Sequence, residues 1–156
     1  MTLHFEQATP DDFAAIEDIY RQAFPRYVHA VGRELLSDPR GDLEAYRCAQ
    51  NLWVARDVAG IAGFLMLASH ADTLELEKIC VLPPRQGSGV GPFLLDGLED
   101  LARERQLLTL ALHTTRKMTG LVRLYQRQGY RIIREGPPEH GLDDFTRVYM
   151  EKRLDP

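Results

Sequence analysis

The part of the chain best suited to chemistry is a cluster of glycines between a predicted strand and a predicted helix. It reads Gln86-Gly87-Ser88-Gly89-Val90-Gly91 and follows residues 74–82, a run that is apolar near its end and is closed by two prolines. Glycine lacks a Cβ, so the backbone can turn sharply and its N–H groups can approach an anion. A helix that begins directly after the glycines adds N–H donors and a favourable dipole. This stretch therefore predicts a site for a pyrophosphate group.

The spacing of the glycines excludes two common nucleotide-binding loops. A P-loop needs a Gly-Lys-Ser or Gly-Lys-Thr end, and no such lysine follows here. The dinucleotide pattern Gly-x-Gly-x-x-Gly would place its third glycine at Pro92 or at Leu94. Ser88 also lacks the flanking spacing of the Gly-x-Ser-x-Gly turn of hydrolases. ATP binding of the P-loop type, NAD binding and serine hydrolysis are therefore not predicted.

The pattern Gln-x-x-Gly-x-Gly, which runs from Gln86 to Gly91, resembles the pyrophosphate loop of the GNAT superfamily of acyl-CoA-dependent N-acetyltransferases. The likeness covers residues 50–135 well and includes residues 76–83 before the loop and 124–130 after it. Residues 75–91 look most like spermine/spermidine acetyltransferase-like members, although a likeness in the cofactor half does not fix the acceptor. The resemblance implies acetyl-CoA, or coenzyme A, as the co-substrate.

The resemblance also implies roles for the residues around the loop. Backbone N–H groups would hold the CoA pyrophosphate; they belong to Gln86, Gly87, Ser88, Gly89, Val90 and Gly91. The preceding strand would end in Ile79, Cys80 and Val81, and the backbone of Ile79 and Val81 would pair with the pantetheine arm like an added strand. The N–H of Val81 would face the thioester oxygen, because this strand is splayed from its neighbour where the cofactor enters.

Two further positions match the family, and one departs from it. Tyr125, in a Leu-Tyr-x-x-x-Gly-Tyr motif, matches the tyrosine that commonly contacts the cofactor and protonates the departing thiolate. Met118 stands where the family often has an asparagine near the pantetheine. The asparagine contact is therefore missing at this position. Thr115, Arg116 and Thr119 are the candidates to replace it, and Arg116 could also reach a CoA phosphate; the alternative is that all three are ordinary surface residues.

Glu75 and Glu77 are the candidates for a general base. They alternate along one strand, so in a regular strand both face the same side of the sheet. Some members of the family use a glutamate on this strand, and Glu75 has the matching register relative to Val81, with Glu77 second. The alternative is an ordinary solvated strand face beside Lys78. Members without a positioned base also exist, because an amine can lose its proton to water.

The sequence predicts neither a metal site nor a covalent intermediate. None of the five histidines is spaced to share a helical face with another, and no cysteine pair joins them. His113 is expected to be a structural histidine at the end of a buried strand. Cys48 and Cys80 have no visible base partner, so we expect the acetyl group to pass directly to the acceptor.

Size, composition and charge set the wider limits. With 156 residues, 44% of them hydrophobic and 27% charged, the chain is expected to form one folded domain over residues 1–156. There are 19 basic and 23 acidic residues, and the net charge of −4 lacks the basic footprint that nucleic-acid binding needs. We expect no nucleic-acid partner.

Other features bear on the compartment and the assembly. The longest uncharged apolar stretch, residues 58–68, is much shorter than the roughly 20 residues that cross a bilayer. The N-terminus lacks the charged and apolar regions of a secretory signal, and two cysteines suit a reducing compartment. We expect a cytoplasmic protein that does not bind a membrane. A homodimer is the commonest symmetric assembly, but the sequence leaves the oligomeric state open.

The elements that position these residues follow from hydrophobic periodicity and turn residues. We expect a strand at 3–8, a helix that starts at Thr9-Pro10 and ends at Pro25, and helical pieces at 33–36 and 43–49 split by a turn at 38–41. Strands follow at 52–56, 61–68 and 74–82, then a helix at 90–106, a strand at 107–113, a helix at 119–128 and strands at 130–134 and 145–152. This is an α/β fold (mixed α+β), with a mixed central sheet of about six or seven strands flanked by about four helices.

The sequence thus predicts an N-acetyltransferase that moves an acetyl group from acetyl-CoA directly to a primary amine of a small molecule or peptide. The alternative is a non-catalytic acyl-CoA-binding sensor or interaction module of the same fold, which Met118 favours. A transferase for succinyl or another acyl group would differ only in its donor pocket. The acceptor stays open, because residues 20–50 and 135–146 carry no motif.

Overall fold

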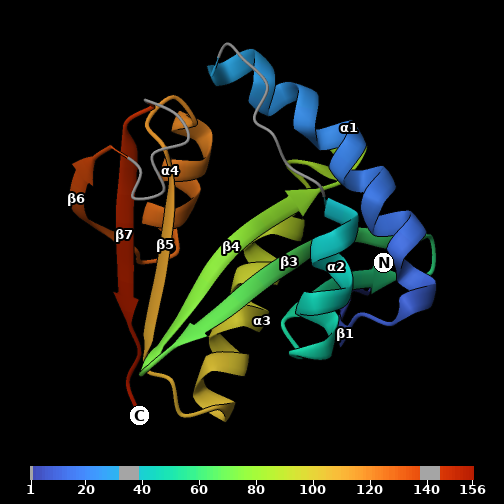
Figure 1. Ribbon diagram of the computed structural model, residues 1–156, viewed down its shortest axis with the longest axis horizontal. Coiled ribbons are helices and arrows are strands. Elements are labelled where there is room, and N and C mark those ends of the chain that lie inside the picture. Colours follow the sequence, from blue (N-terminus) through green and yellow to red (C-terminus); the bar gives the residue numbers. More distant parts are fainter. Residues whose placement is uncertain (1, 32–38, 138–144) are drawn as a thin grey trace.

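A computed structural model describes the backbone of residues 2–31, 39–137 and 145–156, with the side chains of these residues except 26–31 and 39–42. Within this part of the chain, seven strands form one sheet in the order β1-β2-β3-β4-β5-β7-β6 (Figure 1). The strands are β1 (His4–Gln7), β2 (Leu52–Asp57), β3 (Gly60–His70), β4 (Thr73–Val81), β5 (Thr109–Thr115), β6 (Arg131–Gly136) and β7 (Arg147–Arg153). The helices are α1 (Phe13–Val31), α2 (Pro39–Cys48), α3 (Val90–Glu104) and α4 (Thr119–Arg127), with short 3-10 turns η1 (Pro10–Asp12) and η2 (Pro83–Arg85). The predicted mixed α/β architecture is confirmed.

Helices cover both faces of the sheet, and each face has its own core (Figure 1). On one face, α1 and α2 pack Ile16, Ile19 and Leu43 against strand residues such as Phe64. On the other face, α3 and α4 pack against the neighbouring strand residue Leu65. Adjacent strand residues point to opposite faces, so one strand serves both cores. The functional consequence is that each residue of β4 and β5 can be assigned to the α1 side or to the α3 side.

The feature of the sheet that matters most for function is the separation of β4 from β5. These two strands are parallel and pair only over Thr73–Leu76 and Thr109–Leu112. At the same place the register between β3 and β4 shifts, which leaves Glu77 as an extra residue between Leu76 and Lys78. A bulge bends a strand and increases its twist. Beyond the bulge β4 and β5 diverge, as Figure 1 shows, and the predicted splay is confirmed.

Two prolines do not act as predicted. The first helix does not end at Pro25; α1 continues through it to Val31. Pro25 removes the hydrogen bond to the carbonyl of Arg21, but Arg21 is exposed, so water can satisfy that carbonyl. Pro39 begins α2 rather than forming a turn, because the first helical position needs no N–H donor. The helical piece predicted at 33–36 lies outside the described residues.

The end of α3 sets where β5 begins. The helix ends at Glu104, and the N–H of Leu107 donates to Ala102 O at 2.8 Å to close it. Residues 107 and 108 therefore belong to the connection, and β5 starts two residues later than predicted. This shift brings Thr114 and Thr115 into the strand at its splayed end. No helix in the described chain combines the length and apolarity needed to cross a membrane.

Candidate active site

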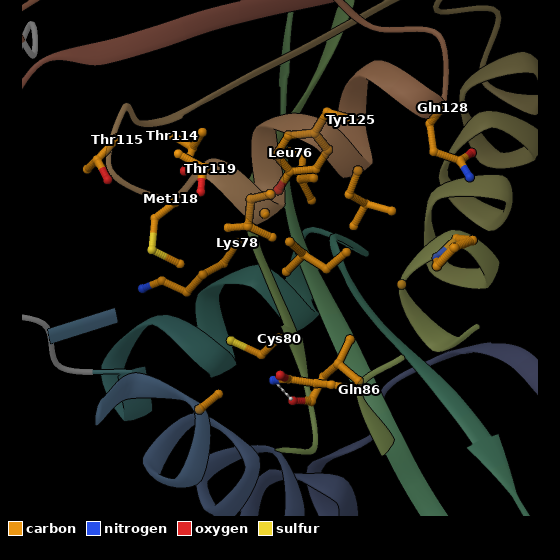
Figure 2. Close-up of a pocket in the computed structure, with 18 of the residues that line it drawn as sticks. Leu76, Lys78, Cys80, Gln86, Thr114, Thr115, Met118, Thr119, Tyr125 and Gln128 are labelled. Carbon is orange, nitrogen blue, oxygen red and sulfur yellow. Dashed lines mark hydrogen bonds between the residues drawn. The ribbon is translucent and has the colours of Figure 1, made fainter. Parts of the chain in front are cut away.

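The gap between the diverging ends of β4 and β5 opens into a cavity of about 1160 Å³. Its walls come from β4, the glycine loop, β5 with the segment that follows it, α4, and α1. Figure 2 shows Lys78 and Cys80 from β4, and Met118 and Tyr125 from the opposite wall, around this space. A cavity of this size is larger than most small-ligand pockets and accommodates an extended molecule.

The glycine loop forms one end of the cavity. Gly87 and Gly89 have φ of +82° and +95°, a conformation that residues with a Cβ rarely adopt, and a Cβ at either position would meet open space. The N–H groups of Gly87 and Gly89, and of Val90 and Gly91 in the first turn of α3, make none of the backbone hydrogen bonds found in the described turns and caps. These donors are available to an anion. The cradle therefore fits the predicted pyrophosphate.

The residues predicted to form this loop divide into two groups. Gln86, Gly87, Gly89 and Gly91 line the cavity. Ser88 turns away, and its hydroxyl donates to the carbonyl of Arg85. The Val90 side chain is buried in the core, so any contact of Ser88 or Val90 with a cofactor must come from the backbone.

Two polar contacts hold the loop to the sheet. Arg85 Nη2 lies 2.7 Å from Asp57 Oδ2 at the end of β2, and the Asp57 side chain is fully buried. The hydrogen bond from Arg85, and to a smaller extent that from the N–H of Ala59, keep the pKa of Asp57 below its usual value. Burial of the carboxylate acts in the opposite direction. Gln86 Nε2 donates to Val81 O at 3.1 Å, a contact drawn in Figure 2. The cradle is thus fixed to both the β2–β3 hairpin and the end of β4.

Gly63 in β3 lets the start of α3 lie close to the sheet, and it was not singled out from the sequence. A Cβ on Gly63 would lie 2.7 Å from Cys80 O and 3.2 Å from Val90 Cγ1. The missing side chain lets the first residue of α3 pack directly on β3, beside β4. An isolated glycine inside an apolar strand is the signal that indicates such a close approach.

The backbone of β4 supplies further donors along the cavity. The N–H of Leu82 donates to Ala62 O of β3 at 2.9 Å. In extended chain, successive N–H groups point to opposite edges, so the N–H groups of Val81 and Ile79 point away from β3 and toward the cavity. Ile79, Cys80 and Val81 all line it. This is the orientation expected of a strand edge that pairs with a pantetheine arm.

Tyr125 occupies the α4 wall. Its ring is buried, it lines the cavity, and Figure 2 shows the hydroxyl oxygen pointing into that space. Burial, together with the nearby Cys80, raises the pKa of Tyr125 well above its usual value. Burial also raises the pKa of the Cys80 thiol to about 12. At neutral pH both groups are therefore protonated.

Glu75 and Glu77 lie on the same side of the sheet, as predicted, but only Glu77 lines the cavity. Glu75 is held from both sides, with Oε2 at 2.9 Å from His70 Nε2 and Oε1 at 3.9 Å from His113 Nε2. Burial, and then the neighbouring charge of Glu75, raise the pKa of Glu77. Glu77 is therefore the glutamate whose pKa moves toward neutrality and whose carboxylate faces the cavity.

The histidines are arranged in a way that sequence spacing does not reveal. The β3–β4 hairpin brings ligand atoms of His70, Glu75 and Glu77 within 4.8 Å of one another. His113 is exposed and lines the cavity, which contradicts the expectation of a buried structural histidine. The reason is that β4 and β5 pair only as far as Leu112, so His113 is the first residue of β5 beyond that pairing. Across the sheet its ring lies 5.5 Å from that of Tyr149.

Comparison with known sequences identifies the family. A sequence model of the acetyltransferase (GNAT) family matches residues 13–130, well over half of the chain. The chain belongs to this family. The resemblance seen in residues 86–91 is thereby confirmed at the level of the family. Acetyl-CoA is the co-substrate of GNAT acetyltransferases, and the cradle and β4 edge fit it.

Relatives of this GNAT chain among curated proteins match only in part. YyaT of Bacillus subtilis strain 168 is 34% identical over 82 residues, which are 53% of this chain and 51% of that protein. A second protein of the same organism is 32% identical over 83 residues. The chain spans about half the length of the curated relatives it matches.

Solved structures share the GNAT fold over nearly the whole chain. The ribosomal-protein-alanine N-acetyltransferase of Brucella melitensis has a TM-score of 0.78 at 22% identity, covering 97% of this chain and 99% of that chain. YncA of Salmonella typhimurium, solved with its cofactor acetyl-CoA, has a TM-score of 0.78 at 22% identity, covering 99% and 95%. These identities support a common fold. They do not separate spermine/spermidine acetyltransferase-like members from others.

Several residues of this GNAT site carry no motif. Arg147 and Lys117 were not singled out from the sequence, and Thr115 was considered only as a replacement for the asparagine contact near the pantetheine. Thr115 of β5 and Arg147 of β7 are directly paired in the sheet, both are buried, and both line the cavity. Lys117, which follows β5, also lines it, and its Nζ lies 5.7 Å from the centre of the Phe145 ring. Strands far apart in sequence bring these residues together, so no local pattern identifies them.

Proposed function

We propose that this chain is an acetyl-CoA-dependent N-acetyltransferase that moves the acetyl group directly to a primary amine of a small molecule or peptide. One observation carries the proposal. A single cavity joins an anion cradle at Gly87 and Gly89, an open strand edge at Val81, and the buried phenol of Tyr125. These are donors for a pyrophosphate, a thioester oxygen and a departing thiolate.

In this proposal the backbone binds and orients the donor. The cradle holds the pyrophosphate, and the β4 edge at Ile79 and Val81 pairs with the amides of the pantetheine arm. The N–H of Val81, which points into the cavity, hydrogen-bonds the thioester oxygen. Negative charge grows on that oxygen during the reaction, so this contact strengthens in the transition state.

The transfer itself needs one new bond and one broken bond. The lone pair of the neutral amine attacks the thioester carbonyl carbon, so that a C–N bond forms and the C–S bond breaks. The electron pair of the C–S bond leaves on sulfur as the CoA thiolate. The nitrogen gives up one proton, and the thiolate takes one up. The reaction therefore needs an acceptor for the first proton and a donor for the second.

Tyr125 is the donor toward the sulfur. Because its pKa is raised, the phenol stays protonated and can hydrogen-bond the developing thiolate. The same raised pKa opposes complete transfer to a thiol of ordinary pKa, roughly 8.5. Tyr125 therefore stabilises the thiolate by its hydrogen bond, and the proton that turns the thiolate into a thiol comes from solvent.

Glu77 is the better placed acceptor for the proton of the amine. Its carboxylate lines the cavity, whereas Glu75 lies behind it against His70 and His113. A raised pKa makes Glu77 a stronger base than an ordinary glutamate, provided that it is ionised. Glu75 acts on Glu77 through its charge. Cys80 takes no part as a nucleophile, because its pKa of about 12 keeps the thiol protonated.

The test begins with a thermal-shift titration of the protein with acetyl-CoA, free CoA and NADH. We expect saturable stabilisation by the two CoA ligands only, because a ligand that binds the native state raises apparent stability. Thiol release is then followed with a panel of amines. Release with any primary amine supports the transferase. CoA binding without release from any amine supports the sensor module that Met118 favours, and no CoA binding refutes the cradle.

The remaining features of the proposal concern the protein as a whole. We propose that residues 1–156 act as a single domain, in a reducing cytoplasmic compartment, and without nucleic-acid or membrane partners. The described Cys48 and Cys80 are both free thiols, which supports the reducing compartment. A homodimer stays a prediction, and sedimentation equilibrium of the purified chain tests it.

A further inference from the structure

The charge of the cavity wall is opposite to that of the chain. The described lining contains four cationic side chains, Lys78, Lys117, Arg127 and Arg147, and one carboxylate, Glu77. With histidine neutral, the lining therefore carries 4 − 1 = +3, against −4 for the whole chain. Arg127, at the end of α4, is the one cation among these on the cofactor side. The others need a different explanation.

Strand geometry places Thr115 and Arg147 on the side of the sheet opposite the cofactor helices. Leu110 and Leu112 of β5 belong to the core under α3, so the alternating residue Thr115 points to the other face. Arg147 is its direct partner on β7 and shares that face. On β4, Lys78 also faces this side, since its Nζ lies 5.0 Å from the centre of the Tyr20 ring of α1. The cradle and α3 would hold the cofactor on the other side, so this side is the one left for an acceptor.

Thr115 and Arg147 form a buried polar pair at the cavity wall. Thr115 is 1% exposed, and its hydroxyl has no hydrogen-bond partner in the described chain. Arg147 is 4% exposed, and its Nη1 donates to Phe145 O at 3.1 Å. A buried hydroxyl without a partner is costly, which favours a ligand that satisfies it. A guanidinium presents several donors in one plane and suits a carboxylate.

The β4 wall of the cavity suits a positively charged group, whereas the wall with Thr115 and Arg147 suits a carboxylate. Glu77 faces the cavity with Glu75 behind it, so this part of β4 attracts an ammonium group before it loses its proton. A molecule that satisfies both walls carries an amine and a carboxylate close together. A polyamine would place further positive charges against Lys78, Lys117 and Arg147.

We propose that the acceptor is an amine that also carries a carboxylate, as an α-amino acid does, and that Thr115 and Arg147 bind this carboxylate while Glu77 faces the amine. The inference rests on the proposed function, because it names the acceptor of the same site. Thr115 and Arg147 are specificity-determining residues in this proposal. They take no part in the bond changes.

The experiment compares acceptors that differ only in the carboxylate. Thiol release from acetyl-CoA is measured with L-phenylalanine against phenethylamine, and with L-methionine against 3-(methylthio)propylamine. The amide of each amino acid and spermidine complete the panel. We expect kcat/KM for the better amino acid to exceed that of its amine and its amide by at least tenfold. Equal or faster release from the amine twins, or from spermidine, overturns the inference and leaves the proposed transferase standing.

Variants locate the carboxylate contact. Thr115→Val removes only the hydroxyl and is expected to raise the KM for the amino acid roughly tenfold, with the KM for acetyl-CoA unchanged. Thr109→Val is the matched control, because Thr109 lies on the same face of the same strand but outside the cavity. Arg147→Lys keeps the charge and loses the planar fork, so it should raise the same KM further. An unchanged KM in Thr115→Val and Arg147→Lys contradicts the proposal.

A binding measurement covers the case in which no amine releases thiol. The CoA-saturated protein is titrated with the same pairs in a thermal-shift assay, and only the carboxylated members are expected to stabilise it further. Stabilisation by the amino acids without thiol release refutes the transferase and keeps the carboxylate site. Stabilisation by neither member of any pair overturns the site.

Discussion

One half of the cavity offers backbone groups to a ligand, and the other half offers side chains. The half proposed for the cofactor, here the cofactor half, offers backbone N–H groups of one continuous segment, from Ile79 on β4 to Gly91 in α3. The half proposed for the acceptor, here the acceptor half, offers side chains from α1, β4, β5 and β7, such as Tyr20, Lys78, Thr115 and Arg147. A backbone site demands glycines at fixed spacing, whereas a side-chain site demands only that distant strands meet. This is why one half carries a sequence motif and the other does not.

The same difference bears on how each half tolerates change. Only proline removes a backbone N–H donor, so other substitutions weaken the cofactor half only by displacing its backbone. Side-chain donors are removed one at a time, so the acceptor half can change its ligand while the fold stays intact. If the two halves are independent, a variant in one half should change the KM for its own substrate and leave the KM for the other substrate unchanged.

The largest loss of activity is expected at Tyr125, the residue at which the two halves meet. Tyr125→Phe removes the hydroxyl that faces the cavity and should lower kcat by roughly 10², because the departing thiolate loses its hydrogen-bond donor. Tyr130→Phe is the control, since Tyr130 is also buried, its hydroxyl has no partner among the described residues, and its ring lies 5.9 Å from that of Tyr125. The two variants are compared in steady-state kinetics. Equal kcat values in Tyr125→Phe and the wild type contradict the role of this phenol.

A substitution that displaces the backbone of β3 or β4 should lower the stability of the protein and weaken cofactor binding together. Gly63→Ala places a Cβ 2.7 Å from Cys80 O, a backbone atom that can move only if β3 and β4 separate. We expect the free energy of unfolding to fall by about 1–3 kcal/mol and the KM for acetyl-CoA to rise. Gly120→Ala is the control, because its Cβ meets open space. Denaturant unfolding and kinetics of both variants decide the matter; a Gly63→Ala protein as stable as the wild type shows that the contact is not tight.

The pH dependence should distinguish Glu77 from Glu75. A general base acts when ionised, so the rate falls as the pH drops below the raised pKa of Glu77. Glu77→Gln should remove this acidic limb and lower kcat/KM at neutral pH about tenfold, a modest loss because an amine can also lose its proton to water. Glu75→Gln keeps the limb but shifts it to lower pH, because the charge that raises the pKa of Glu77 is gone. A limb that persists in Glu77→Gln assigns the base elsewhere.

Much of the fold could be predicted from sequence because its signals are local. The strand-to-helix turn at residues 86–91 and the helix end at Gly129, with φ of +95°, follow from residues that are neighbours in the chain. The prolines show the limit of local reasoning. Pro25 is tolerated inside α1 where both it and Arg21, four residues earlier, are exposed, and the rule that proline ends a helix takes no account of that exposure.

The acceptor half could not be predicted because its contacts are not local. Thr115 and Arg147 are neighbours only because β7 lies between β5 and β6 in the sheet, an order that sequence periodicity does not reveal. The cluster of His70, Glu75 and Glu77 likewise depends on the register of the β3–β4 hairpin and its bulge. Where a site depends on register between strands, a single sequence identifies the residues only after the sheet is known.

The smallest effect is expected where the cofactor half does rely on a side chain. Asp57→Asn leaves Arg85 without its anionic partner, so the cradle loses one of its two fixed points and the KM for acetyl-CoA should rise a few-fold. The matched control is Asp12→Asn. Like Asp57, Asp12 pairs with an arginine. Its partner is Arg56 of β2, with Asp12 Oδ1 at 2.8 Å from Arg56 Nη2, and Asp12 lies outside the cavity lining. Both substitutions should lower the unfolding temperature, and only Asp57→Asn should change the KM.

The lowered pKa of Asp57 fixes the pH range of this effect. A carboxylate whose pKa is depressed in the folded state contributes stability above its unfolded value, roughly 3.9, and loses it as the pH falls through the folded value. Between pH 6 and about pH 8 the pair stays ionised, so the ratio of KM values between Asp57→Asn and the wild type should be constant across that range. A ratio that changes within it would mean that the cradle depends on a different titrating group, and the cofactor half would then share the side-chain dependence of the acceptor half.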